Sequence, residues 1–491
     1  MTIPPDRNEF QPSSRERGII LTLLIAAFVV ILNETILNVA LPRLMAELKV
    51  GASTVQWLAT AFMLTMAVVI PTTGFILQRF STRTVFLAAM GLFSLGTLIA
   101  GMAPAFPLLL AGRVIQASGT ALMLPLLITT ILALVPPAHR GATMGSVSIV
   151  ISVAPAIGPT LSGLILEVLP WRFLFLCVVP VALLVLAYGA RRLVNVGETR
   201  ATALDLLSVL LSAVGFGGVV YGFSSAGEPG GWSNPKVLVA LVAGGLSLLL
   251  FGLRQRMLVR RDAPLLDLRA FAYPAFRLSV GIIMIAMMSL FGAAILLPIY
   301  LQNIRGLGSL ETGLLLLPGG LLMGLAASTV GKLFDRYGPR VLSVAGATLL
   351  TLTLWGLSTV VAGTPVGLLL GLHLVLSLGL ALLFTPVMTS GLNVLPGYLY
   401  SHGSAITSTL QMVSGAVGTA LLVTVMTARA AGLRAVVPPE LAQAAGLHAA
   451  FALAAGIAAV GLVLTFFLRR VVPAGSEANV ETGTQAAPAS D

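Results

Sequence analysis

The chain has 491 residues, of which 57% are hydrophobic and only 9% are charged. A soluble protein of this length needs far more surface charge, so the composition excludes an ordinary water-soluble enzyme or binding protein. The net charge of +11 comes from basic residues spread over loops and does not indicate a nucleic-acid-binding surface. The single cysteine, Cys177, excludes a disulfide framework and argues against a cysteine-based metal or redox site.

The apolar residues form blocks of about 20 separated by short polar loops, which predicts membrane-spanning helices rather than a β-barrel. An even number of spans would place both termini on one side. With the termini inside, twenty of the 28 basic residues fall in inner segments and seven in outer loops, which predicts cytoplasmic termini. The fourteen candidate spans are 18–42, 53–77, 84–103, 106–134, 141–167, 171–191, 204–224, 236–256, 276–302, 310–331, 340–361, 365–390, 403–429 and 446–470.

A repeated loop motif divides the chain into two related halves. Gly74 to Arg83 follows the second span, and Gly331 to Arg340 follows the tenth. Two related halves with a site between them at the middle of the membrane form a transporter plan. We therefore expect a cytoplasmic N-terminal segment (1–17), a first six-helix bundle (18–191), two inserted helices with their linkers (192–275), a second six-helix bundle (276–470) and a disordered cytoplasmic tail (471–491).

Polar side chains lie well inside the first span. Asn33, Glu34 and Asn38 interrupt an otherwise apolar run. Such groups are costly in lipid, so by default they face a cavity or a partner and mark a pathway. A proton-driven exchanger needs a group that is charged in one state and neutral in another, which makes Glu34 the leading candidate for proton coupling. The alternatives are a structural carboxylate paired with an arginine and a residue at the water-exposed outer edge.

Arg113 is a basic residue well inside the fourth span, and Gln116 lies on the same helix face. A guanidinium can hold a carboxylate or change its proton affinity through charge proximity. The alternative is an ion pair that only holds spans 1 and 4 together. The expected residues of a substrate cavity are Asn33, Asn38, Gln116, Trp57 and Gln411.

Four motifs in the right order resemble the major facilitator superfamily, specifically its fourteen-span drug:proton antiporters and the lincomycin-resistance type of exporter among them. They are LNETILNVALP in the first span, the loop motif that occurs once in each half, Arg113 to Gly119 in the fourth span, and Gly145 with Ala154 to Gly163 in the fifth. The resemblance implies an all-α integral membrane fold of two six-helix bundles plus two inserted helices. It also implies export of amphiphilic drugs from the cell in exchange for protons, by alternating access.

The resemblance gives the other motifs structural roles. In the family the fifth-span motif seals the cavity between the halves, and its small residues also let helix backbones approach closely. Its residues are Gly145, Ala154, Pro155, Gly158, Pro159 and Gly163. The loop motifs imply a latch for one conformation, made by Gly74, Arg79, Arg83, Gly331, Asp335, Arg336, Gly338 and Arg340.

Two departures from the family pattern stand out. The family acid of the first span usually sits one position earlier, where this chain has Asn33, and adjacent helix positions point about 100° apart. The Glu34 side chain would therefore have to bend around the helix to take the place of the family acid, or the main proton site lies elsewhere. In the first loop motif Gln78 replaces the acid, so Arg79 and Arg83 are equally well interpreted as ordinary positive-inside residues.

The sequence has no Walker-type phosphate loop, no Cys/His metal cluster and no nucleophile elbow with plausible partners. We therefore expect no ATP dependence, no cofactor, no metal and no enzyme activity. The expected partners are a small amphiphilic substrate, protons and the lipid bilayer, for a monomer in the cell membrane. The alternative function is export or import of a specific endogenous metabolite by the same fold.

Overall fold

The computed structural model describes residues 13–50, 52–196, 205–226, 231–260, 264–361, 363–433 and 436–469. The predicted tail (471–491), most of the predicted N-terminal segment, and the side chains of Asn38 and Pro159 lie outside the described part. Within these ranges the regular structure is entirely helical, without a strand. The described residues contain 14 helical stretches long and apolar enough to cross a membrane, which confirms the number predicted from the apolar blocks.

The first bundle holds the first six of these stretches. Its helices are α1 (Ser14–Leu48), α2 (Ala52–Val69), α3 (Thr73–Arg79), α4 (Thr82–Gly101), α5 (Phe106–Leu134), α6 (Arg140–Val168), α7 (Phe173–Leu176) and α8 (Val178–Arg192). The short 3₁₀ turn η1 (Ile70–Thr72) joins α2 to α3, so these elements make one span. A second such turn, η2 (Pro137–His139), precedes α6.

The inserted helices and the second bundle follow. The insert consists of α9 (Leu206–Ala226), the turn η3 (Gly231–Ser233) and α10 (Pro235–Val259), and the turn η4 (Leu268–Ala272) leads out of it. The second bundle holds α11 (Pro274–Ile299), the π-helical turn η5 (Tyr300–Ile304), α12 (Ser309–Tyr337), α13 (Pro339–Leu357), α14 (Val366–Asn393), the turn η6 (Gly397–Leu399), α15 (Tyr400–Leu433) and α16 (Pro439–Thr465).

Local signals set the ends of α1. The Ser13 hydroxyl accepts a hydrogen bond from the backbone N–H of Glu16, and the Glu16 carboxylate accepts one from the backbone N–H of Ser13. This reciprocal arrangement satisfies donors that the first turn would leave unpaired. At the other end Lys49 takes the left-handed conformation, with a φ of 52°, that commonly terminates helices. The helix is therefore longer than the predicted span 18–42.

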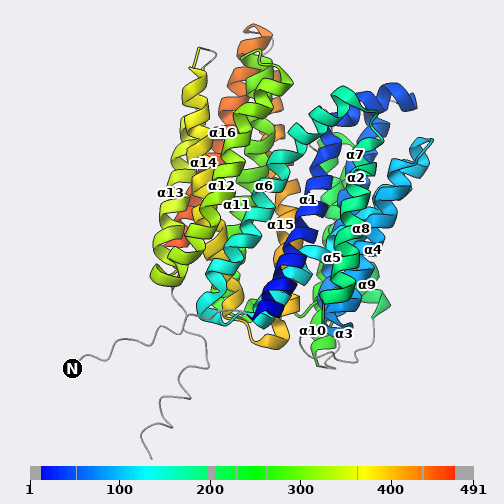
Figure 1. Cartoon of the computed structure of the whole chain (residues 1–491). Helices are drawn as coiled ribbons and strands as arrows, with labels where there is room; N and C mark the ends of the chain where they lie inside the picture. Colours follow the sequence, from blue (N-terminus) through cyan, green and yellow to red (C-terminus); the bar gives the residue numbers. More distant parts are fainter. Residues whose placement is uncertain are drawn as a thin grey trace, which may run out of the picture.

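The two bundles meet along α6 and α12, which lie side by side (Figure 1). We call the end where α1 begins and α16 ends the inner end, and the opposite end the outer end. At the inner end a Cβ on Gly331 would collide with the backbone of Gly141. Further along, a Cβ on Gly145 would lie 2.5 Å from the carbonyl oxygen of Ala327. These glycines let the two backbones touch, as small residues do in membrane helix pairs.

The contact between α6 and α12 extends only part of the way towards the outer end. Ala156 still meets α12 at Gly320. Beyond it, a Cβ on Gly163 of α6 or on Gly313 of α12 would find no described atom within 4 Å. The close contact between α6 and α12 therefore runs from the inner end to about the middle of the two helices, and these two glycines do not continue it.

Candidate functional site

Close packing between α4 and α5 brings polar side chains of the two helices into contact. A Cβ on Gly96 would collide with the backbone of Gln116, and a Cβ on Gly112 would lie 2.8 Å from the backbone nitrogen of Ala100. Side chains at these glycines would push the helices apart. Their absence brings the hydroxyl of Thr97 on α4 directly against the amide of Gln116 on α5.

Gln116 is the centre of a buried hydrogen-bond network. Nη1 of Arg113 donates to Oε1 of Gln116 at 2.6 Å. Nε2 of Gln116 donates to Oδ1 of Asn33 and to Oγ1 of Thr97, both at 2.7 Å. Thr97 in turn donates to the carbonyl oxygen of Phe93 at 2.6 Å. Three helices, α1, α4 and α5, thus share one network, and it joins two predicted cavity residues to the predicted arginine.

Arg113 is almost fully buried, with 1% of its surface exposed. Its guanidinium carbon lies 4.0 Å from the centre of the Phe62 ring on α2, an arrangement in which the aromatic face attracts the cation. Its Nε has no hydrogen-bond partner among the described residues, and neither has Nδ2 of Asn33. Buried donors are normally satisfied, so the network can accept further polar groups.

Glu34 lies beside this network, next in the chain to Asn33 on α1, and its side chain is half-buried. Its carboxylate and the Arg113 guanidinium interact electrostatically. The ion pairs within 4.0 Å between described residues do not include one between them. In this conformation α1 and α5 are joined by Asn33 and Gln116, and not by the ion pair considered as an alternative.

The fifth-span motif faces two neighbours. Gly158 of α6 lies against Thr35 of α1, and its missing side chain leaves room for the Thr35 hydroxyl next to Glu34. Gly145 lies against α12, and Ala154 is buried. Pro155 is half-buried. The motif thus packs α6 both onto the helix that carries Glu34 and onto the second bundle.

A small cavity lies between the bundles. It has a volume of about 10 Å³ and is lined by Ser148, Ile151, Ser152, Met323, Phe384, Met388 and Gln411. This is space for about one water molecule. Nε2 of Gln411 is buried without a partner among the described residues, whereas Ser148 and Thr385 share a hydrogen bond of 2.7 Å across the bundles. Gln411 therefore lines a small inter-bundle cavity, and its role in a substrate cavity stays a prediction.

Trp57 is elsewhere. Its ring stacks on Tyr221 of the inserted helix α9, with ring centres 6.3 Å apart, and 44% of its surface is exposed. The cavity lining does not include it. This residue therefore belongs, in this conformation, to the contact between α2 and the insert.

The two loop motifs join the bundles at the inner end, each in its own way. Asp335, in the last turns of α12, accepts hydrogen bonds of 3.1 Å from the backbone N–H groups of Gly141 and Ala142 at the start of α6. Helix N-termini attract carboxylates in this way. In the first half Nε2 of Gln78 donates to the carbonyl oxygen of Tyr398, just before α15, at 2.9 Å. At position 78 an amide that donates a hydrogen bond therefore stands where the family pattern has an acid, which would accept one.

The remaining motif residues surround these contacts. Gly74 lies against His402 of α15, and Gly338 has a φ of 80° between α12 and α13, where glycine is favoured. Arg83 donates to the carbonyl oxygen of Ala190 within the first bundle at 2.7 Å. Arg336 lies over the ring of Tyr337. Arg79 and Arg340 are exposed.

Arg140 is an inter-bundle residue that the sequence did not reveal. It is buried at the start of α6, donates to Oδ1 of Asn393 and to the Tyr400 hydroxyl, both at 3.0 Å, and so reaches across to the second bundle. It also donates to the backbone carbonyl of Val135 at 2.9 Å. In the sequence it stands directly before a span, so it was indistinguishable from other positive-inside residues.

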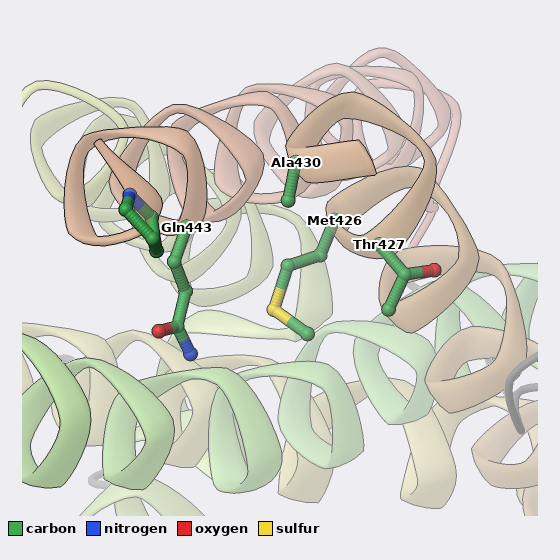
Figure 2. A pocket seen from close by; sticks show the side chains of 5 residues that line it. Met426, Thr427, Ala430 and Gln443 are labelled. Carbon is green, nitrogen blue, oxygen red and sulfur yellow. The ribbon is translucent and has the colours of Figure 1, made fainter. Parts of the chain in front are cut away.

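A larger pocket opens at the outer end between α15 and α16. Its volume is about 420 Å³, and it is lined by Met426, Thr427, Ala430, Pro439 and Gln443 (Figure 2). In Figure 2 the side chains of Met426 and Gln443 point to the same side of the two helices. None of the predicted site residues lines this pocket.

Comparison with known proteins agrees with this architecture. Residues 23–419 match the model of the Major Facilitator Superfamily. The chain is 44% identical over 461 residues to the lincomycin resistance protein LmrB of Bacillus subtilis, covering 92% of this chain and 96% of that protein. It is 42% identical to the protein of that name in Listeria monocytogenes (92% and 96% covered) and 30% identical to the multidrug resistance protein Stp of Mycobacterium tuberculosis (87% and 78% covered).

Solved structures share the fold at low sequence identity. The human organic anion transporter MFSD10 (TETRAN) superposes with a TM-score of 0.62 at 16% identity, covering 93% of this chain and 100% of that one. The proton:xylose symporter XylE superposes with a TM-score of 0.61 at 15% identity, covering 93% and 96%. At these identities the likeness concerns the fold alone.

Proposed function

The chain belongs to the major facilitator superfamily, and we propose that it is a proton-coupled exporter that moves amphiphilic drugs out of the cell by alternating access. The observation that carries the proposal is the position of Glu34. A half-buried carboxylate lies beside a buried arginine and a network of amides inside a membrane-spanning bundle. Intramembrane acids in such surroundings serve ion pathways by default.

Exchange follows from competition at Glu34. When the carboxyl is protonated, Arg113 loses its charged neighbour, and its interactions with Gln116 and Phe62 remain. When the proton leaves, the carboxylate and guanidinium attract each other again, because opposite charges interact strongly away from water. A substrate bound next to the site would favour one of these states. Proton release and substrate binding would then be linked, as antiport requires.

The inter-bundle contacts support alternating access. Asp335 and Gln78 join the bundles at the inner end, whereas Gly163 and Gly313 face open space beyond the middle. This is the arrangement expected of a transporter open towards its outer end. Breaking the inner contacts and closing the outer ends would expose the site to the other side.

The residues between the bundles suit an amphiphilic substrate. Met323 and Met388 are flexible and polarizable, Phe384 is aromatic, and Gln411 offers an unpaired buried amide. Methionine-rich surfaces repack around different ligands. Two of the relatives named above are lincomycin resistance proteins, which makes lincomycin the natural first probe.

The proposal is tested by reconstituting the protein in liposomes with an acidic lumen and measuring lincomycin uptake. We expect accumulation that needs no ATP and collapses when a protonophore dissipates the pH gradient. Protein-free liposomes are the control. Uptake that ignores the gradient would contradict proton coupling. Absence of any drug transport, together with gradient-driven movement of a native metabolite, would contradict the drug substrate and favour the metabolite exporter or importer.

A further inference from the structure

The inserted helix α9 lies against both bundles at once. Phe216 and Val220 of α9 form a buried apolar cluster with Ala67 of α2. The partly buried side chains that pack onto it come from both sides, from Met63 and Leu64 of α2, Leu248 of α10, and Met412, Val413 and Ala416 of α15. α2 and α15 belong to different bundles, so α9 covers the seam between them.

Directed contacts tie the insert to the second bundle at its outer end. Nε1 of Trp232, in the turn η3 between the inserted helices, donates to Oγ1 of Thr424 on α15 at 2.6 Å. The Trp232 ring also packs edge-on against Phe223 of α9, with ring centres 6.0 Å apart. This tryptophan therefore connects α9, η3 and α15.

The linker that leaves α10 ties the insert to the second bundle at the inner end. Oε1 of Gln255 accepts hydrogen bonds from the backbone N–H groups of Leu265 and Leu266, at 2.8 and 3.2 Å. Asp267 follows, is buried, and pairs with Arg269 at 2.6 Å. The Arg269 guanidinium carbon lies 5.6 Å from the centre of the Tyr398 ring, at the start of the α15 span. The linker is thus packed into the protein next to the second bundle.

The contact between α9 and α2 of the first bundle is of another kind. Tyr221 stacks on Trp57, and a Cβ on Gly217 would lie 3.7 Å from Cγ2 of Val68. Between described residues, no hydrogen bond or ion pair links α9 or α10 to α2. Apolar contacts are non-directional and can re-form after a shift of one surface along another. Hydrogen bonds lose most of their strength when their geometry changes.

We propose that α9 and α10 move as part of the second bundle and keep the seam between α2 and α15 closed, while α2 slides along α9. The inference rests on the proposed rocking of the two bundles. It gives the insert a definite role. A substrate dissolved in the bilayer cannot enter between α2 and α15 in any state, because α9 covers that seam throughout the cycle.

Cross-linking tests the proposal on the full-length protein. Cys177 is the single native cysteine, so Cys177→Ser provides a cysteine-free background. One cysteine pair, Val68→Cys with Gly217→Cys, joins α9 to the first bundle. A matched pair, Trp232→Cys with Thr424→Cys, joins the insert to the second bundle. Each pair is treated with a short bifunctional methanethiosulfonate, which links the two cysteines through disulfides, and transport is compared before cross-linking, after it, and after cleavage of the disulfides by a reductant.

The expected result is asymmetric. Cross-linking residues 68 and 217 should lower lincomycin transport at least tenfold, with recovery after reduction, and cross-linking 232 and 424 should leave at least half of it. The reverse result would overturn the proposal, and so would equal loss or equal retention with the two pairs.

A third pair separates this inference from the proposed function. Gln78→Cys with Tyr398→Cys joins the bundles directly at the inner end, where the two residues share a hydrogen bond. If cross-linking this pair blocks transport, the bundles move relative to each other, and the first two pairs decide how the insert moves. If it does not block transport, the rocking of the bundles is itself wrong.

Discussion

Asn33 and Glu34 are neighbours in α1, but their side chains meet different surroundings. Asn33 is 2% exposed and accepts a hydrogen bond from Gln116. Glu34 is half-buried and interacts electrostatically with Arg113, without an ion pair within 4.0 Å between them among the described residues. Adjacent helix positions differ by about 100° in direction, so a carboxylate at position 33 and an amide at position 34 would not make the same contacts.

A relocated carboxyl tests how far the position matters. In a Glu34→Gln variant, we expect Asn33→Asp to restore part of the proton coupling, because a carboxylate at position 33 would accept the same bond from Gln116 and lie nearer the arginine network. Proton movement driven by a lincomycin gradient measures the restoration. If Asn33→Asp restores nothing although the double variant still binds lincomycin, the proton site requires position 34 itself.

Part of this residue-scale geometry could be predicted. The spacing of Arg113 and Gln116 predicts a shared helix face, and the structure joins them by a hydrogen bond. The contribution of Thr97 could not be foreseen, because it depends on the backbone contact that Gly96 permits between α4 and α5. The sequence around a glycine in an apolar span does not indicate which helix will pack against that glycine.

At the scale of elements, α6 offers a matched pair of glycines. A Cβ at Gly158 would collide with the Thr35 side chain, whereas a Cβ at Gly163 would meet no described atom within 4 Å. We expect Gly158→Ala to lower stability by about 1–3 kcal/mol, as overpacking does, and to reduce transport. Gly163→Ala should leave the stability of this conformation unchanged. Thermal unfolding in detergent and transport assays measure both, and similar effects of the two substitutions would contradict this packing.

The start of α9 gives a pH-dependent prediction. Asp205, just before the span, accepts hydrogen bonds of 2.6 Å from Arg254 and 3.0 Å from the backbone N–H of Ser208. The Arg254 side chain, helped by Ser208, holds the pKa of the Asp205 carboxyl well below its usual range. A carboxyl with a lowered folded-state pKa stabilises the fold above its ordinary pKa, about 3.9 for aspartate, and loses this contribution as the pH falls further.

Asp205→Asn should therefore lower stability at pH 7 by about 1 kcal/mol, because Arg254 loses its charged partner while the amide oxygen can still accept from Ser208. The difference from the wild-type protein should shrink as the pH is lowered from 4 to 3. Melting temperatures in detergent across this range measure it. A difference that stays constant with pH would show that the charge of Asp205 contributes nothing.

The helices themselves were largely predictable. Fourteen apolar blocks became fourteen membrane-length helical stretches, because hydrophobicity over about 20 residues is a strong signal. The ends were less predictable. The predicted first span, 18–42, became a helix from Ser14 to Leu48, because the Ser13 and Glu16 cap and the backbone of Lys49 set its ends, whatever the hydropathy.

At the scale of the whole molecule, three contacts join the two bundles at the inner end. Asp335 binds the start of α6, Gln78 binds the carbonyl of Tyr398, and Arg140 reaches Asn393. The loop motifs predict a latch, and this role of the contacts stays a prediction. Conformations that differ by only a few kcal/mol share one sequence, so no motif could record which of them these contacts stabilise.

Removing the Asp335 carboxylate should weaken the contact between the two bundles at the inner end. In the Cys177→Ser background, a cysteine placed at Ser148 is buried beside the small inter-bundle cavity and should react slowly with a thiol reagent. Adding Asp335→Ala should speed its labelling several-fold from the inner side, because the start of α6 loses two charge-assisted hydrogen bonds. Unchanged labelling would show that Asp335 does not hold the bundles together.

The central claim is that Glu34 couples protons to substrate, and it is tested most directly by one comparison in liposomes. A lincomycin gradient is imposed, and the movement of protons is followed with a lumenal pH dye. Glu47 supplies the matched control. It is an exposed carboxylate near the end of the same helix, and it pairs with Arg43 at 3.6 Å. We predict that the wild-type protein and Glu47→Gln move protons alike, whereas Glu34→Gln binds lincomycin and moves none. Full coupled proton movement by Glu34→Gln would contradict the account.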